Sequence, residues 1–358
     1  MRPRRLIFLM FLCVFLARQM SRAEDVPAKP TPPAQPAQGP GGAAASAAKV
    51  QSQQFGEKGA SYWLYWPDEP KPETAPVIIF LHGWGGVEPK AYRNWIDHLV
   101  QRGNLVIFPR YQENLRTQPG EFMPNAVAAI KDALVQCNTV AGIAPDLTKF
   151  AVVGHSAGGA LAANLAVSAI AQGLPQPRAV MPVEAAIGMS AELDDVMAGR
   201  FPVEDFSKIP APTLLLVVAG QDDDVAGDRL GRKIFSGATA VPAANRNLIT
   251  VRSDAHGEPA LRATHFAPLA PAAAAANQPG GTGDRPRLPA LQSRLAAATD
   301  ALDYFGYWKW FDALTDAAFT NTNRDYALGN TDRQRNMGHW SDGVPVTPAT
   351  VETVGETK

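Results

Sequence analysis

The sequence contains very little cysteine. Only Cys13 and Cys137 are present among its 358 residues. Cys13 lies in an N-terminal segment that we expect to be removed, which leaves Cys137 with no partner for an intramolecular disulfide. The stability of an exported mature chain must therefore come from a packed core and not from cross-links.

The apolar run at the N-terminus is too short to cross a membrane. It covers Leu6–Leu16, eleven residues, whereas a spanning helix needs about 20. Three arginines precede the run and Ser21-Arg22-Ala23 follows it, which is the pattern of a secretory signal peptide. We expect residues 1–23 to be cleaved near Ala23, giving a secreted or periplasmic protein without a stable membrane span. An uncleaved anchor is the alternative.

Positive charge is not in excess beyond that segment. Without residues 1–23, the chain has 28 basic and 34 acidic side chains, a net charge of -6 with histidine neutral. Nucleic-acid-binding proteins normally present a basic face, so we do not expect a nucleic-acid partner. The histidines and cysteines also lack the spacing of a metal site, so we predict no metal and no cofactor.

The composition divides the chain into segments. Residues 24–54 are rich in proline, alanine, glutamine and glycine, which predicts a disordered tether. Residues 55–345 have the composition of one folded domain, interrupted at 267–287 by an alanine- and proline-rich stretch that we interpret as a flexible insertion. We expect residues 346–358 to be a C-terminal tail.

Within that domain, apolar strands alternate with amphipathic segments. Strands are predicted near residues 60–66, 77–81, 105–108, 151–154, 180–183, 213–219 and 248–251, with helices between most of them. This alternation predicts an α/β fold with a mostly parallel, doubly wound sheet and helices on both faces. Residues 188–209 could form a small cap, and residues 291–319 predict an extra C-terminal helical region.

Ser156 stands in Gly154-His-Ser-Ala-Gly158, between a β-branched strand and an alanine-rich helix. A serine flanked by glycines at a strand-to-helix turn is typical of the nucleophile elbow of serine hydrolases. The turn holds the serine in a strained conformation, and the glycines give the strand and helix room to pass. We therefore take Ser156 as the candidate nucleophile.

A serine nucleophile needs a base, and the base needs an orienting acid. Asp223 is the preferred acid because it lies three residues beyond the strand-ending Gly220; Glu184, Asp222 and Asp224 are the alternatives. His256 is the preferred base because it lies on a tight loop after the strand at 248–251. His265, nine residues further on, is the competing histidine.

An oxyanion hole requires two backbone N–H groups near the serine. Ala157 supplies one at the start of the helix, where N–H groups have no helical acceptor. The second is expected from His82-Gly-Trp-Gly-Gly86, with Trp84 as the donor. We expect Gly83, Trp84 and His155 to contact the substrate.

These motifs together resemble the α/β-hydrolase superfamily over about residues 60–260. The Gly-His-Ser-Ala-Gly elbow and small cap are most similar to serine esterases of the dienelactone-hydrolase and acetylhydrolase types. The resemblance implies hydrolysis of small to medium carboxylic esters through an acyl-enzyme, with no cofactor. The region from about residue 288 departs from the minimal fold. A serine peptidase or acyltransferase, and a non-catalytic binding protein on the same fold, are the alternatives.

Overall fold

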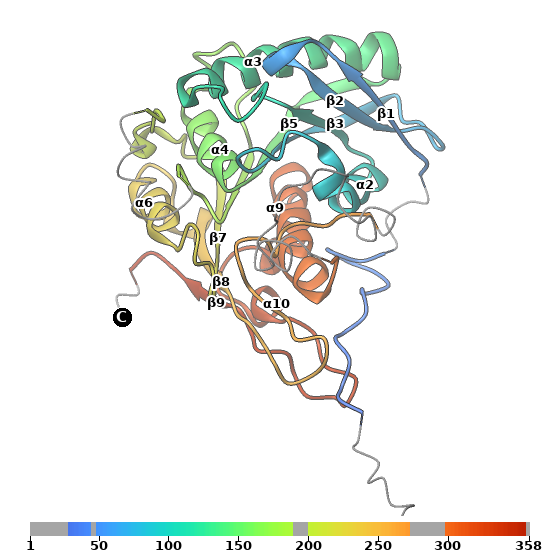
Figure 1. The fold of residues 1–358 in the computed structure, drawn as a ribbon, viewed down its shortest axis with the longest axis vertical. Helices are drawn as coiled ribbons and strands as arrows, with labels where there is room; N and C mark the ends of the chain where they lie inside the picture. Colours follow the sequence, from blue (N-terminus) through green and yellow to red (C-terminus); the bar gives the residue numbers. More distant parts are fainter. Residues whose placement is uncertain (1–27, 44–47, 189–199, 273–297, 356–358) are drawn as a thin grey trace, which may run out of the picture.

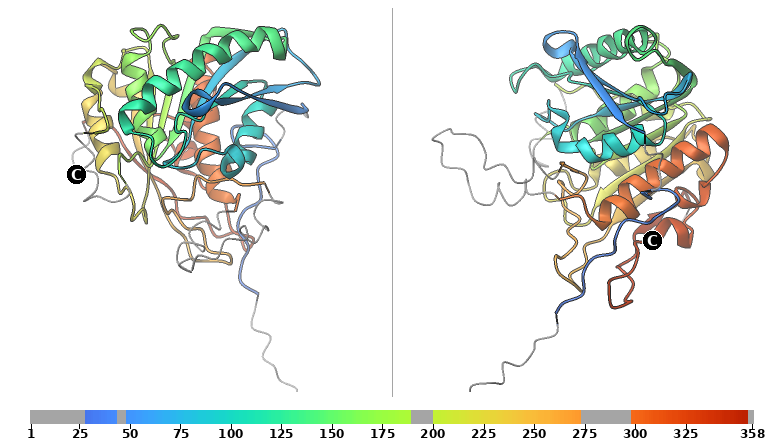
Figure 2. Two further views of the ribbon diagram at one scale, coloured as in Figure 1. Left: turned by 45° about the horizontal axis from the view of Figure 1, so that its top comes forward. Right: turned by 90° about the vertical axis from the view of Figure 1, so that its right-hand side faces the viewer.

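The computed structural model describes residues 28–43, 48–188, 200–272 and 298–355. The proposed signal peptide, much of the cap and most of the predicted insertion lie outside these residues. The described part is built around one nine-stranded sheet with helices on both faces (Figures 1 and 2). The strands are β1 Val50–Phe55, β2 Tyr62–Pro67, β3 Thr74–Leu81, β4 Leu105–Pro109, β5 Ala144–His155, β6 Ala179–Val183, β7 Leu214–Gly220, β8 Arg246–Val251 and β9 Thr350–Glu352.

The strand order is β1-β2-β4-β3-β5-β6-β7-β8-β9. The strands from β4 to β8 in this order pair in parallel, whereas β1, β2 and β9 pair antiparallel with their neighbours. Parallel neighbours require crossovers, and α-helices supply them. This arrangement confirms the α/β fold with a mostly parallel, doubly wound sheet that the sequence predicted.

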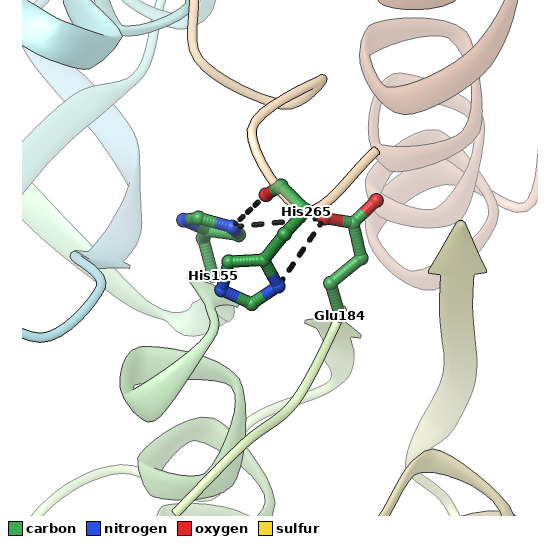
Figure 3. Close-up of side chains that lie close together, drawn as sticks. All are labelled: His155, Glu184 and His265. Atoms are coloured by element: carbon green, nitrogen blue, oxygen red, sulfur yellow. Dashed lines mark hydrogen bonds and ion pairs between the residues drawn. The ribbon is translucent and has the colours of Figure 1, made fainter. Parts of the chain in front are cut away.

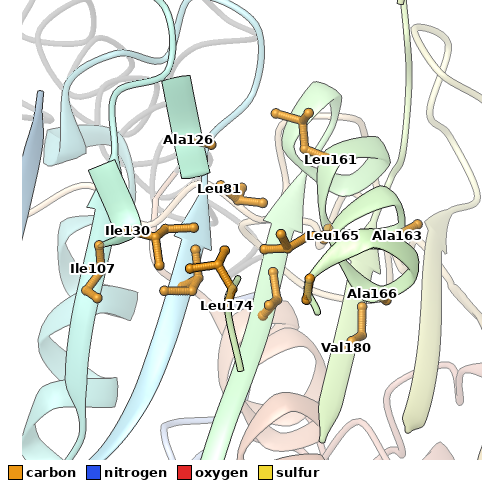
Figure 4. Close-up of a cluster of buried hydrophobic side chains, with 14 of the residues drawn as sticks. Leu81, Ile107, Ala126, Ile130, Leu161, Ala163, Leu165, Ala166, Leu174 and Val180 are labelled. Carbon is orange, nitrogen blue, oxygen red and sulfur yellow. The ribbon is translucent and has the colours of Figure 1, made fainter. Parts of the chain in front are cut away.

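The helices lie in two layers. They are α2 Arg93–Gln101, α3 Pro119–Gln136, α4 Ala157–Ser168, α6 Arg229–Gly237, α9 Trp308–Thr320 and α10 Asp332–Arg335. The first apolar layer unites α3, α4 and α6 with one face of the sheet, and part of it is drawn in Figure 4. The second unites α2 and α9 with the opposite face.

Strand β3 shows why both faces must be covered. Val77, Ile79 and Leu81 point into the first layer, while Ile78 and Phe80 point into the second. Successive side chains of a strand alternate between the two faces of the sheet, so a continuous apolar run is favoured where other elements cover both faces. The run 77–81 therefore fits the interior position of β3, between β4 and β5.

The N-terminal segment differs from its prediction. Residues 28–43, which we call the strap, run along the C-terminal part of the molecule (Figure 1). The Glu258 N–H donates to the Pro30 carbonyl at 2.8 Å, and the Gly41 N–H donates to Asp312 Oδ2 at 2.8 Å. Residues 50–55 form the edge strand β1. The prediction of a disordered tether over 24–54 is therefore wrong for these described residues, because backbone hydrogen bonds hold a segment with few apolar side chains.

Two further boundaries also need correction. Residues 350–352, expected in a tail, form β9 on the edge of the sheet beside β8. Leu269 and Ala270, expected in a flexible insertion, are buried, and Ala270 exchanges hydrogen bonds with the segment at Ala91–Asn94. The rest of the insertion, residues 273–287, lies outside the described residues.

Candidate active site

Ser156 lies in a sharp turn between β5 and α4. Its φ of 56° and ψ of -121° put a non-glycine residue in a sparsely populated backbone region. A Cβ atom on Gly154 would overlap the carbonyl oxygen of Gly158, and one on Gly158 would overlap the carbonyl oxygen of Leu81. Only glycine fits at both positions, so the pattern read from the sequence is a steric requirement of this turn.

His265 lies between Ser156 and Asp223. Its Nε2 is 2.9 Å from Ser156 Oγ, and its Nδ1 is 2.9 Å from Asp223 Oδ2. An ionised carboxylate only accepts hydrogen bonds, so Nδ1 carries the proton and Nε2 presents its lone pair to the serine hydroxyl. The three groups have the geometry of an activated nucleophile, a base and an orienting acid.

Asp223 follows β7, and its surroundings favour the ionised form. Burial opposes ionisation, but the His265 hydrogen bond and two backbone N–H groups together lower the pKa of Asp223 below its usual value. Val225 and Ala226 supply these N–H groups to Oδ1 at 2.9 and 2.8 Å. The aspartate is therefore held rigidly and is charged at neutral pH.

The prediction that His256 is the base is wrong in its geometry. His256 Nε2 contacts Asp342 Oδ2 at 2.7 Å at the surface, where the histidine side chain is 37% exposed. Asp254 and Leu261 form an antiparallel bridge, so the chain after β8 makes an excursion with His256 on it. The Asp222 N–H donates to the Ala263 carbonyl at 2.9 Å, so the chain lies beside the end of β7 again at this point. His265, two residues later, is thereby placed at the site.

The His82–Gly86 loop lies against the serine. A Cβ on Gly83 would be 3.3 Å from Ser156 Cβ, so glycine permits the close approach. The Gly85 N–H donates to Gln112 Oε1, and the Gly86 N–H to the Gly83 carbonyl. Among the described residues, the Trp84 N–H has no hydrogen-bond acceptor. Ala157 begins α4, so its N–H also has no helical acceptor.

A pocket of about 240 Å³ opens in front of Ser156. The predicted contact residues Gly83, Trp84 and His155 all line it. The pocket is also lined by three residues that no sequence pattern had indicated, Tyr92, Phe266 and Leu269. The His265-Phe266 pair was the available signal, because His265 is followed by apolar residues whereas His256 is surrounded by turn-forming and charged ones.

Glu184, the alternative acid, lies behind the site at the end of β6 (Figure 3). Its Oε2 is 3.7 Å from His155 Nε2 and 3.9 Å from His265 Nδ1, too far for hydrogen bonds. Its Oε1 accepts a hydrogen bond from the Tyr307 hydroxyl at 2.9 Å. Burial raises the pKa of Glu184 to about 8. Asp223, not Glu184, therefore makes the hydrogen bond that orients His265.

His155, Glu184 and His265 also form the one cluster of metal-ligand residue types found among the described residues. The two nitrogens nearest to Glu184 are hydrogen-bond donors, however. His155 Nε2 donates to the His265 carbonyl at 2.7 Å, and His265 Nδ1 donates to Asp223. A nitrogen that carries a proton has no lone pair for a metal ion, so this arrangement does not suit one.

Comparisons with known proteins found partial similarity to a family model and to a solved structure. A family model described as chlorophyllase matches residues 41–196, which include the His82–Gly86 loop and Ser156 but neither Asp223 nor His265. Among solved structures, the chain is similar to one from a structural analysis of two fungal esterases from Rhizomucor miehei. The identity is 16%, the TM-score is 0.45, and the match covers 57% of this chain and 74% of that one. No curated protein matches the sequence.

Proposed function

We propose that the protein is a serine-dependent hydrolase that cleaves carboxylic esters of small to medium size. The observation that carries the proposal is the placement of His265 between Ser156 and Asp223, with hydrogen-bond distances of 2.9 Å on both sides. The partial match to the chlorophyllase family model and the strained turn at Ser156 support the same reaction.

The reaction proceeds in two steps. Ser156 Oγ attacks the ester carbonyl carbon while His265 Nε2 accepts the serine proton, and the resulting oxyanion receives hydrogen bonds from the Trp84 and Ala157 N–H groups. The tetrahedral intermediate collapses, and His265 returns the proton to the departing alkoxide, so an alcohol leaves and an acyl-enzyme remains. Water then attacks the acyl carbon with His265 again as base, which releases the carboxylic acid and restores the serine.

The pocket supports a substrate of limited size. Its volume of about 240 Å³ and its apolar lining by Trp84, Phe266 and Leu269 suit a short acyl chain. A panel of p-nitrophenyl esters of increasing acyl length, compared with matched anilides, tests this choice. Turnover that favours short esters would support the proposal. Faster cleavage of the anilides would favour a peptidase, and the appearance of transesterified product with added alcohol would favour an acyltransferase.

The nucleophile is tested by Ser156→Ala. Removing a triad serine lowers kcat by about 10⁶-fold in a well-studied hydrolase, so we expect ester turnover to fall by several orders of magnitude without unfolding. Ser168→Ala, in the last position of α4, is the matched control. Retained activity in Ser156→Ala, or labelling of a different serine by a fluorophosphonate probe, would contradict the assignment of the nucleophile. A folded wild-type protein with neither turnover nor labelling would favour a non-catalytic binding protein.

We also propose that the mature protein is exported after cleavage near Ala23. The proposal is supported by the basic start and apolar run of residues 1–23. No helix in the described part of the chain is long and apolar enough to cross a membrane. N-terminal sequencing of protein recovered from the periplasm or medium is the test. A chain that keeps residues 1–23 would contradict cleavage.

A further inference from the structure

A line of buried hydrogen bonds connects the two loops on either side of Ser156. The Gly83 N–H donates to Tyr92 Oη at 2.9 Å, and Tyr92 Oη lies 2.9 Å from His155 Nδ1. His155 Nε2 in turn lies 2.7 Å from the His265 carbonyl oxygen. Figure 3 shows His155 directed toward this carbonyl. The line therefore begins in the loop that contains Trp84 and ends on the backbone of the proposed base.

The partners determine where each proton lies. A carbonyl oxygen only accepts, so His155 Nε2 carries the hydrogen and Nδ1 presents a lone pair. The Tyr92 hydroxyl then donates to Nδ1, and its oxygen accepts the Gly83 N–H. Both side chains are nearly inaccessible to solvent, with exposures of 2% for Tyr92 and 3% for His155. Burial also lowers the pKa of His155 to about 4 and raises that of Tyr92, so both groups stay neutral.

The two connected loops have little other regular structure. The His82–Gly86 loop follows β3, and the segment with His265 follows the excursion after β8. Catalytic groups must be held within a fraction of an ångström, and loops alone provide this less well than strands or helices. Tyr92, by contrast, is anchored by packing on Phe80 at a ring-centroid distance of 5.1 Å, and His155 is the last residue of β5.

We propose that Tyr92 and His155 are positioning residues that hold the oxyanion loop and the base loop in fixed relation across Ser156. This inference rests on the proposed esterase function. Neither side chain is required to exchange a proton. They hold the two loops in place because their own rings are fixed by the sheet and by the short helix Pro89–Tyr92. Both loops supply groups to the same reaction.

The test removes single hydrogen-bonding groups. Tyr92→Phe deletes one oxygen, and His155→Phe keeps a ring but removes both nitrogens. We expect kcat for a p-nitrophenyl ester to fall about 10- to 100-fold in each, with KM changed much less, because misplacement affects the transition state more than substrate binding. The kcat of the double variant should be about equal to that of the less active single variant, since the two residues act as one unit.

Two further variants separate positioning from a purely structural role. His155→Gln places an amide N–H near the former Nε2 and should recover part of the kcat lost in His155→Phe. Tyr62→Phe is the matched control, because it removes the hydroxyl of another buried tyrosine, bonded to Asp132 and remote from the pocket. It should lower the melting temperature while leaving kcat unchanged.

The outcomes distinguish this inference from the proposed function. A loss of kcat in Tyr92→Phe and His155→Phe, absent in Tyr62→Phe and partly reversed in His155→Gln, supports the positioning role. An active wild-type enzyme in which Tyr92→Phe lowers only the melting temperature overturns this inference alone. A folded wild-type protein that neither hydrolyses esters nor reacts with a fluorophosphonate at Ser156 overturns both proposals.

Discussion

At the residue scale, His256 and His265 occupy the same loop but have different surroundings. His256 is 37% exposed beside Asp342, whereas the side chain of His265 is 4% exposed between Ser156 and Asp223. An imidazole can act as a base only when its free nitrogen faces the nucleophile and its other nitrogen is held. The surroundings of His265 meet this condition, and those of His256 do not.

Substituting these two histidines separately gives the first prediction. His265→Ala should lower ester turnover by several orders of magnitude, because Ser156 loses its proton acceptor. His256→Ala removes a surface contact with Asp342 and a ring contact with Trp340, neither of which touches the pocket, and should retain close to wild-type kcat. Steady-state kinetics on one ester decide the matter. If His256→Ala were inactive and His265→Ala active, the assignment made from the structure would be reversed.

Glu184 gives a second prediction at this scale. Burial raises the pKa of Glu184 from its ordinary value of 4.5 to about 8 in the folded protein, so between these pH values the folded state holds a proton that the unfolded state has lost. Stability should therefore decrease as pH rises through this window, by at most about 1.4 kcal/mol per pH unit. Glu184→Gln cannot ionise, so its stability relative to wild type should increase from pH 5 to pH 8.

Urea denaturation of wild type and Glu184→Gln at several pH values provides the measurement. Contributions from other groups cancel in the difference between the two proteins. A difference that stays constant with pH would show that Glu184 does not hold its proton in the folded state.

At the scale of elements, the turn between β5 and α4 depends on two glycines packed against backbone. A Cβ on Gly158 would overlap the carbonyl oxygens of Leu81 and His82, which cannot rotate away as a side chain could. Gly158→Ala should therefore cost roughly 1–3 kcal/mol or more of unfolding free energy. It should also lower activity, because the His82–Gly86 loop must shift.

Gly120→Ala is the matched control for that prediction. Gly120 lies in the first turn of α3, where an added Cβ would meet no atom within 4 Å. Alanine favours a helix over glycine, so this variant should be unchanged or slightly more stable. Equal stability of Gly158→Ala and wild type in urea denaturation would contradict the steric explanation.

The sequence predicted those features that depend on a local pattern of residues. The buried strands were predictable from their apolar runs, and Ser156 and Asp223 were found from short patterns beside strands. The edge strand β1, with the sequence Val-Gln-Ser-Gln-Gln-Phe, was missed because its side chains are mostly exposed and leave no alternating apolar pattern. His265 was ranked behind His256 as the base, and Tyr92 was not identified at all, because long-range folding, not local sequence, brings these residues to the site.

At the scale of the whole molecule, the strap joins the start of the chain to its C-terminal region. The Ser341 N–H donates to the Thr31 carbonyl at 3.0 Å, and the Thr31 N–H donates to Ser341 Oγ at 2.9 Å. Gly41 donates to Asp312, a buried carboxylate that also contacts His98 and Arg102. The strap therefore donates one hydrogen bond to a carboxylate deep in the second layer.

Removing the strap gives the fourth prediction. A chain that begins at residue 44 should have a melting temperature several degrees lower than one that begins at residue 24, because Asp312 loses one hydrogen bond and the Glu258 N–H loses its acceptor. Lys29→Ala is the control, since Lys29 and Glu258 form an exposed ion pair of little energetic value. Equal melting temperatures for the two chains would mean that the strap adds nothing to stability.

The strap also affects the order in which the protein can be completed. Its hydrogen bond between Thr31 and Ser341 joins residues 310 positions apart. Residues 28–43 leave the ribosome well before Asp312 and Ser341, with which they form hydrogen bonds. Until residue 341 has been synthesised, Thr31 lacks its partner and the strap cannot dock completely, so its full attachment comes late in biogenesis.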